Sequence, residues 1–120
     1  MAILNVGVDF DKDPSGRYYT DGPASGERFR EEFLKPKLGS LSRDEKLEII
    51  IDGEVEGYGS SFLVEGFAGL VKHGYFSKDF LRNRMIIKFS DPDFEFYRDK
   101  IWMYIDSARF RSEKYASTKR

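Results

Sequence analysis

Apolar residues along the chain fall into short continuous runs and into runs with helical spacing, and the two kinds alternate. Continuous runs at residues 2–10, 47–51 and 85–89 each predict a strand. The run Leu-Glu-Ile-Ile-Ile at 47–51 is rich in β-branched residues, which is typical of a buried central strand. A brief run at 17–19 predicts a further strand, paired with the first in a hairpin. The residues expected at the buried centre of the sheet are Ile49, Ile50, Ile51, Ile86 and Ile87.

Three longer segments repeat their apolar residues every three or four positions and predict helices. The first follows the turn Asp21-Gly22-Pro23 and ends by Gly39, the second runs from Ser60 to His73, and the third restarts at Asp91-Pro92. The apolar face of the third helix consists of Phe94, Tyr97, Ile101, Tyr104, Ile105 and Ala108. Strands that alternate with helices predict an α/β sandwich, with a mixed, mostly parallel sheet of about four strands and three main helices.

Length and composition predict one domain with an ordinary hydrophobic core. The chain has 120 residues, of which 40% are hydrophobic, and we place the domain at 1–111 and a basic tail at 112–120. The absence of cysteine excludes disulfides, zinc–thiolate sites and cysteine nucleophiles. The first residues lack a basic start and a long apolar run, so neither a signal peptide nor a membrane partner is expected, and we expect a cytoplasmic protein.

Charge argues against nucleic acid as the main partner. The formal net charge is −1, whereas nucleic-acid-binding domains are strongly basic. Only the tail is locally basic, and we expect it to be a solvated terminus. An accessory protein that binds nucleic acid through this tail is the alternative.

The stretch GYGSSFLVEGFAGL at 57–70 is the strongest candidate for a functional site. Ser60 is expected to cap the following helix and Ser61 to lie in its first turn. A serine at a helix start can also carry a phosphate or bind an acidic group beside it, and both readings stay open. A small nucleotide-binding domain is a weaker alternative, because the loop lacks the lysine of a P-loop and Phe62 replaces the third glycine of a dinucleotide fingerprint.

Catalysis, metal binding and cofactors are not expected. The only histidine, His73, would lie about 18 Å from the serines at the other end of their helix, so it cannot serve as their base. It is expected instead to face the negative end of the helix dipole. The spacing Asp9-x-Asp11-x-Asp13 suggests a calcium loop, but the positions that need glycine and glutamate hold Pro14 and Thr20. A polar turn is expected there.

Two patterns leave alternatives open. Gly66 and Gly69 lie inside a helix, where glycine costs about 1 kcal/mol, and this predicts close approach of either the sheet or a partner. Phe96, Trp102 and Met103 lie beside or behind the apolar stripe of the last helix. They form either a dimer or partner patch, or a wider buried face.

Three segments carry a resemblance to a known family: RYYTDGPASGERFREEFL, LEIIIDG and GYGSSFLVEGFAGL. In these segments the chain resembles the STAS-like domains of unknown function found in bacteria and phage, which are related to the STAS domains of anti-sigma factor antagonists. Relatives often carry an acid directly after the Phe-Leu pair, whereas this chain has Val64 there and Glu65 next.

The resemblance implies a regulatory protein-binding module rather than an enzyme. In STAS antagonists, a partner ATPase of the histidine-kinase type phosphorylates a serine at the strand-to-helix junction, within a motif Asp-Ser-Ser/Thr-Gly. Ser60 matches the first serine of that motif, while Gly59 replaces the acid and Phe62 the glycine. The candidate phosphorylation and partner-binding residues are therefore Gly59, Ser60, Ser61, Phe62 and Glu65.

Overall fold

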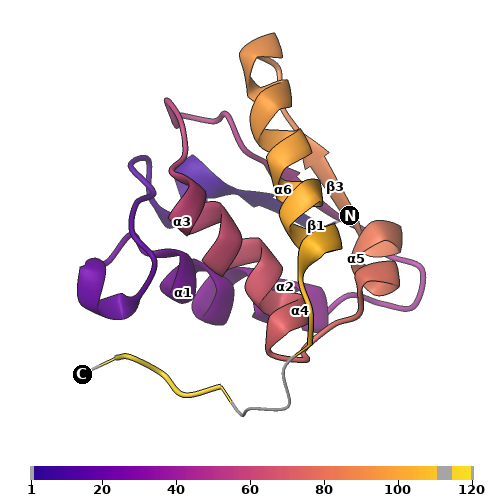
Figure 1. Cartoon of the computed structure of the whole chain (residues 1–120). Helices are drawn as coiled ribbons and strands as arrows, with labels where there is room; N and C mark the ends of the chain where they lie inside the picture. The colour runs from indigo at the N-terminus through magenta and orange to yellow at the C-terminus, as the bar shows by residue number, and fades with distance from the viewer. Residues whose placement is uncertain (1, 111–114, 120) are drawn as a thin grey trace.

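The computed structural model describes residues 2–110 and 115–119, and a small parallel sheet organises them (Figure 1). Its strands are β1 (Ala2–Asn5), β2 (Leu47–Ile50) and β3 (Met85–Lys88), in the order β1-β2-β3. Both pairings are parallel, with Leu47 opposite Ala2 on one side and Met85 on the other. The central position predicted for β2 is confirmed. The described residues form three strands rather than four, and the sheet is not mixed.

The hairpin expected at 17–19 does not form, because local hydrogen bonds satisfy that backbone. The N–H groups of Arg17 and Tyr18 donate to Asp21 Oδ2 at 3.0 and 2.9 Å, and η2 (Tyr19–Asp21) is a single tight turn. These bonds compete with pairing in a sheet.

The first strand is also shorter than expected, since it ends at Asn5. The N–H of Asn5 donates to Asp9 Oδ2 at 2.8 Å, and η1 (Val6–Phe10) is a wide helical turn. Gly7 passes so close to the backbone of Gly53 that a Cβ atom at residue 7 would lie 1.7 Å from the Gly53 carbonyl oxygen. This turn brings the ring of Phe10 within 5.2 Å of the ring of Phe29.

Helices fill the connections between the strands and follow the last one. Ser25 starts the first helix, because its Oγ accepts the N–H of Arg28 at 3.2 Å, so the helix begins at residue 26 rather than at the Pro23 turn. The first helix consists of α1 (Gly26–Arg28), η3 (Phe29–Leu34) and α2 (Lys35–Gly39). The second consists of α3 (Ser60–Leu63), η4 (Val64–Ala68) and α4 (Gly69–Lys72), and it confirms the predicted helix. The remainder are α5 (Lys78–Arg84), η5 (Pro92–Phe94) and α6 (Glu95–Ser107).

Helix α6 and the helix formed by α3 and α4 lie in front of the sheet in Figure 1, and the alternating burial of the strand residues shows that only one sheet face is covered. Leu4, Ile49 and Ile87 point into the core and are buried. Ile86 on the opposite face is 36% exposed, and Ile50 is half-buried. The expectation that these two residues are buried was therefore wrong. The fold has two layers, with its core between the helices and one face of the sheet.

The last helix uses the predicted apolar stripe. Ile101 and Ile105 are fully buried, which confirms the helical spacing. Trp102 packs at the border of the core, with the guanidinium of Arg82 4.4 Å from its ring centroid. Phe96 and Met103 are 59% and 46% exposed. Within residues 2–110 and 115–119, every helix is too short or too polar to cross a bilayer.

Two residues of the described part of the tail contact the domain, while Ala116, Ser117 and Lys119 are exposed. Tyr115 and Thr118 hydrogen-bond to the carboxylate of Glu27 on α1, so the expectation of a solvated terminus was wrong for these two residues. Arg111, Lys114 and Arg120, which contribute to its basic character, lie outside the described residues.

Candidate functional site

Helix α3 starts beside the carboxyl edge of the sheet, because side chains fold the preceding loop back onto that edge. The Tyr58 hydroxyl donates to the carbonyl oxygen of Ile51 at 2.6 Å. Asp52 Oδ2 accepts the N–H groups of Ser90 and Asp91 at 2.6 and 2.8 Å, which ties the loop after β2 to the loop after β3. The serine pair therefore lies at the edge where open parallel sheets commonly place binding sites.

The two serines differ in their surroundings. Gly59, in an extended conformation, occupies the cap position, and no side chain caps the helix. Ser60 is the first helical residue and is exposed, so the expectation that it caps the helix was wrong. Ser61 is half-buried, and its Oγ accepts a hydrogen bond from Arg17 Nη2 at 3.4 Å.

The other two candidate residues lie inside the molecule. Phe62 is fully buried, with its ring 5.4 Å from Phe29 and 5.7 Å from Tyr58. Glu65 is only 4% exposed and pairs with Arg30. The surface part of the predicted site is thus Gly59, Ser60 and Ser61, while Phe62 and Glu65 support it from below.

Arg30 is the residue that sequence reasoning missed. A charged residue of an amphipathic helix is expected on the solvent face, yet the Arg30 side chain is fully buried between the two long helices. Its Nη1 donates to Glu65 Oε2 at 2.7 Å and to the Glu65 carbonyl oxygen at 2.8 Å, and its Nε donates to Glu31 Oε2 at 2.8 Å. Among the residues that the structure describes, its Nη2 has no hydrogen-bond partner. The sequence feature that could have indicated the buried Arg30–Glu65 pair is the spacing of Gly66 and Gly69 in the second helix, which leaves room for the Arg30 side chain.

The glycines allow the two long helices to approach closely. A Cβ atom on Gly69 would lie 2.5 Å from Arg30 Nη1, and one on Gly26 would lie 2.6 Å from the Phe62 carbonyl oxygen. A Cβ atom on Gly66 would lie 3.3 Å from the ring of Phe29. The sequence suggested that either the sheet or a partner approaches Gly66 and Gly69 closely. The structure shows instead that the first helix approaches them.

Glu27 holds the described part of the C-terminal segment against α1. Its carboxylate accepts the N–H of Tyr19 at 3.0 Å, the N–H of Thr118 at 3.1 Å, the Thr118 hydroxyl at 2.5 Å, and the Tyr115 hydroxyl. Burial disfavours the ionised form of Glu27, but the hydrogen bonds from Thr118 and Tyr115 outweigh it and hold its pKa below the ordinary value.

His73 ends the second helix, as predicted, and completes this cluster. Its Nε2 lies 3.8 Å from Glu65 Oε2, and its ring centroid lies 5.1 Å from that of Tyr115. Burial, together with the positive charge of Arg30, lowers the pKa of His73 below its ordinary value.

The acidic repeat near the N-terminus forms the expected polar turn. Asp9 accepts the N–H of Asn5, and Asp11 Oδ1 accepts the N–H of Asp13 at 2.8 Å. In the portion of the chain that the structure describes, no three histidine or acidic side chains are grouped closely enough to hold a metal ion.

These features define a small α/β domain with a parallel sheet. One helix starts with an exposed serine beside the carboxyl edge of the sheet, and glycines allow this helix to pack closely against the first long helix. Residues 25–94 match the family described as the STAS-like domain of unknown function (DUF4325). The chain belongs to that family, as the resemblance in its sequence predicted. Neither a search of curated proteins nor a search of solved structures found a match.

Proposed function

We propose that this chain is a non-enzymatic regulatory module that binds a protein partner through the amino-terminal end of α3. The observation that carries the proposal is the arrangement of the serine pair. Ser60 is exposed in the first turn of a long helix, and Arg17 lies within hydrogen-bond distance of Ser61. An exposed hydroxyl, a helix start and a cation thus occur together.

This arrangement suits a phosphate carried by Ser60 itself. The first N–H groups of a helix have no partner within the helix, and the helix dipole favours negative charge there. Arg17 is partly exposed, and its Nη1 lies 3.8 Å from Glu65 Oε1. A phosphate on Ser60 would add nearly two negative charges, on the order of −1.5 to −2, and would compete with Glu65 for Arg17.

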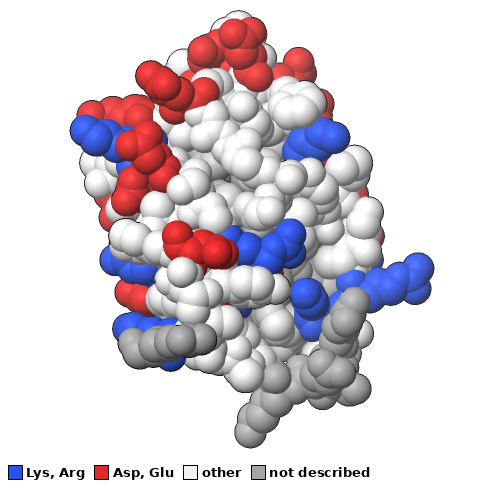
Figure 2. All heavy atoms as spheres, turned by 60° about the vertical axis from the view of Figure 1, so that its left-hand side comes forward, with Lys and Arg blue, Asp and Glu red and all other residues white. Residues whose placement is uncertain are grey.

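The charges around the serines favour a partner with basic groups. Exposed acidic residues occupy the two loops that leave the sheet at this edge, namely Glu54, Glu56, Asp91 and Asp93. Figure 2 shows acidic side chains gathered at the top of the molecule, the end at which α6 begins in Figure 1. Phosphorylation of Ser60 would add to this negative surface and thereby change partner affinity. A kinase-like ATPase of the histidine-kinase type is the partner that the family resemblance suggests.

The surroundings of the serines support binding rather than catalysis. Arg17, a cation, is the side chain that hydrogen-bonds to Ser61, and His73 lies at the far end of the same helix, where it contacts Glu65. Without a general base in contact, a serine hydroxyl remains a weak nucleophile.

Substitution of Ser60 by Glu tests this function. The immobilised wild-type chain is first used to capture binding proteins from the native host. The affinity of each purified partner is then measured for the wild type and for the variants. We expect the affinity of at least one partner to change severalfold in Ser60→Glu and in Arg17→Ala. Ser42→Glu is the matched control, because Ser42 is also exposed but precedes β2, at the opposite edge of the sheet. The proposal fails if Ser60→Glu and Arg17→Ala both bind this partner like the wild type. It also fails if purified chain hydrolyses an ester or a nucleotide and Ser60→Ala abolishes that activity.

A further inference from the structure

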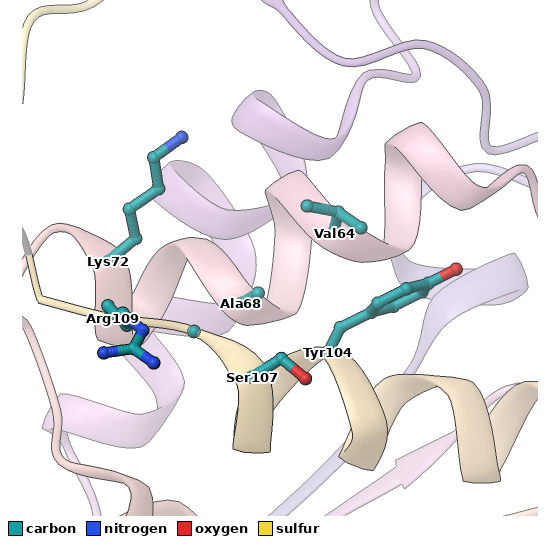
Figure 3. Close-up of a pocket in the computed structure, with 7 residues that line it drawn as sticks. Val64, Ala68, Lys72, Tyr104, Ser107 and Arg109 are labelled. Carbon is teal, nitrogen blue, oxygen red and sulfur yellow. The ribbon is translucent and has the colours of Figure 1, made fainter.

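A cavity of about 310 Å³ lies between the second long helix and α6 (Figure 3). Val64, Ala68 and Lys72 line it from one helix, at intervals of four residues that place them on one face. Tyr104 and Ser107 line it from α6, and Arg109 follows directly after that helix. Small side chains at facing positions, alanine on one helix and serine on the other, leave this space open.

The cavity carries two positive charges that nothing in the described structure neutralises. Lys72 is half-buried and Arg109 is exposed, and neither has a hydrogen bond or an ion pair with any residue in 2–110 or 115–119. Two of the acids near them in sequence are engaged elsewhere: Glu65 pairs with Arg30, and Asp106 pairs with Arg82. Both cations are therefore available to a bound anion.

The polar and apolar walls are separated along the cavity. Figure 3 shows Lys72 and Arg109 towards the same end, while the ring of Tyr104 lies towards the other. Val64 and Ala68 form the apolar wall between them. Most ligand pockets combine apolar walls with a few polar groups, and their volumes begin at about 300 Å³.

We propose that this cavity binds a small organic anion, a carboxylate or phosphate attached to a flat apolar body. The anionic group would lie between Lys72 and Arg109, and the body would lie along Val64 and Ala68 against the Tyr104 ring. The volume limits the ligand to a small molecule. The proposal does not depend on the function proposed for the serine pair, from which this cavity is separate.

Calorimetric titration of the full-length chain tests the ligand class with four probes. 1-Naphthyl phosphate and 1-naphthoate carry the two kinds of anion on the same body, 1-naphthol lacks the anionic group, and inorganic phosphate lacks the body. We expect at least one of the anionic naphthyl probes to bind at least about tenfold more tightly than naphthol and inorganic phosphate. The stronger of the two identifies the preferred anion.

Variants locate the binding. Lys72→Gln combined with Arg109→Gln should weaken binding of the preferred probe by about tenfold or more, and Ser107→Trp should abolish it by filling the cavity. Ser107 is exposed, so this change leaves the core intact. Lys100→Gln is the matched control, because Lys100 lies on α6 but does not line the cavity, and it should bind like the wild type. Circular dichroism of each variant checks its folding.

Three results would overturn the proposal: no binding of either anionic naphthyl probe at millimolar concentration, equal binding of naphthol, or unchanged binding in the folded Lys72→Gln/Arg109→Gln and Ser107→Trp variants.

Discussion

The guanidinium of Arg30 and the carboxylate of Glu65 form an ion pair inside the molecule, with Nη1 2.7 Å from Oε2 and side-chain exposures of 0% and 4%. The pair joins the first long helix to the second directly below the serine-bearing turn. Because both charges are removed from water, each depends on the other for its stability in the folded state.

Removal of one partner should therefore destabilise the fold strongly. Glu65→Ala leaves the Arg30 charge buried with only Glu31 as a paired acid, and we expect a loss of about 3–5 kcal/mol in the free energy of unfolding. Glu32→Ala is the control, because Glu32 makes only surface contacts of this kind, an ion pair with Arg28 at 3.4 Å and a hydrogen bond from the Tyr19 hydroxyl at 2.8 Å, and its loss should cost about 1 kcal/mol. Urea denaturation measures both. Equal effects of the two substitutions would contradict the role of the buried pair.

Gly69→Ala should destabilise the chain although alanine favours helices. The new Cβ would lie 2.5 Å from Arg30 Nη1 and 3.0 Å from Arg30 Cδ, and the buried ion pair restricts how far that side chain can move. Gly39→Ala meets no atom within 4 Å, so it should be neutral or stabilise the fold by up to about 1 kcal/mol. The melting temperature should fall for Gly69→Ala and should rise or stay unchanged for Gly39→Ala. A stabilised Gly69→Ala variant would show that the helices can separate without cost.

Thr118→Val should weaken the fold, since it removes a hydroxyl that donates to Glu27 and accepts the Tyr19 N–H at 3.1 Å. A buried carboxylate that loses a hydrogen bond costs about 1–3 kcal/mol. Ser117→Ala is the control, because its exposed hydroxyl accepts the N–H of Lys119 and contacts Tyr115 rather than donating to Glu27, so it should have the smaller effect.

The same contact should respond to acid. The folded-state pKa of Glu27 lies below its ordinary value of 4.5, so its contribution is present above that pH and is lost as the pH falls through the lower folded value. The difference between wild type and Thr118→Val should shrink accordingly in urea titrations between neutral pH and about pH 3. If the difference in stability between wild type and Thr118→Val stayed the same at every pH, the Thr118 contact would not depend on the ionisation of Glu27.

His73 should make stability rise with pH in the range where histidine titrates. Its folded-state pKa lies below the ordinary value of 6.5, so the unfolded chain binds more protons around that pH and protonation favours unfolding. Stability is therefore complete above 6.5 and falls as the pH drops below it. The chain has one histidine, so His73→Gln should flatten this slope. Urea midpoints at pH 7.5 and 5.5 would check the effect, and an unchanged slope in the variant would assign it to other groups.

Lysine substitutions should distinguish the two faces of the sheet. Ile49 is fully buried, so Ile49→Lys places an unpaired charge in the core and should abolish folding. Ile86 is 36% exposed on the open face, close to Glu48, and Ile86→Lys should retain the native circular dichroism spectrum. Loss of folding in both variants would mean that the open face is covered in solution.

Local pattern was sufficient for the order and type of the main elements. The β-branched run at 47–51 identified the central strand, and the spacing of Ile101 and Ile105 identified the inner face of α6, because residue spacing within one element sets which side chains share a face. The motif at 57–70 also indicated the family and placed the serine pair at a helix start.

Contacts between distant segments decided the remainder. The sequence of β3 alone does not reveal that Ile86 faces solvent, since that depends on which sheet face the helices cover. The polar position of Arg30 became an interior one because Gly69, thirty-nine residues later, leaves room for its guanidinium. Thr118 reaches Glu27 across most of the chain. The sequence by itself determined periodicity and turn chemistry, whereas burial and pairing are properties of the packed fold, because they depend on residues that meet only when the helices dock.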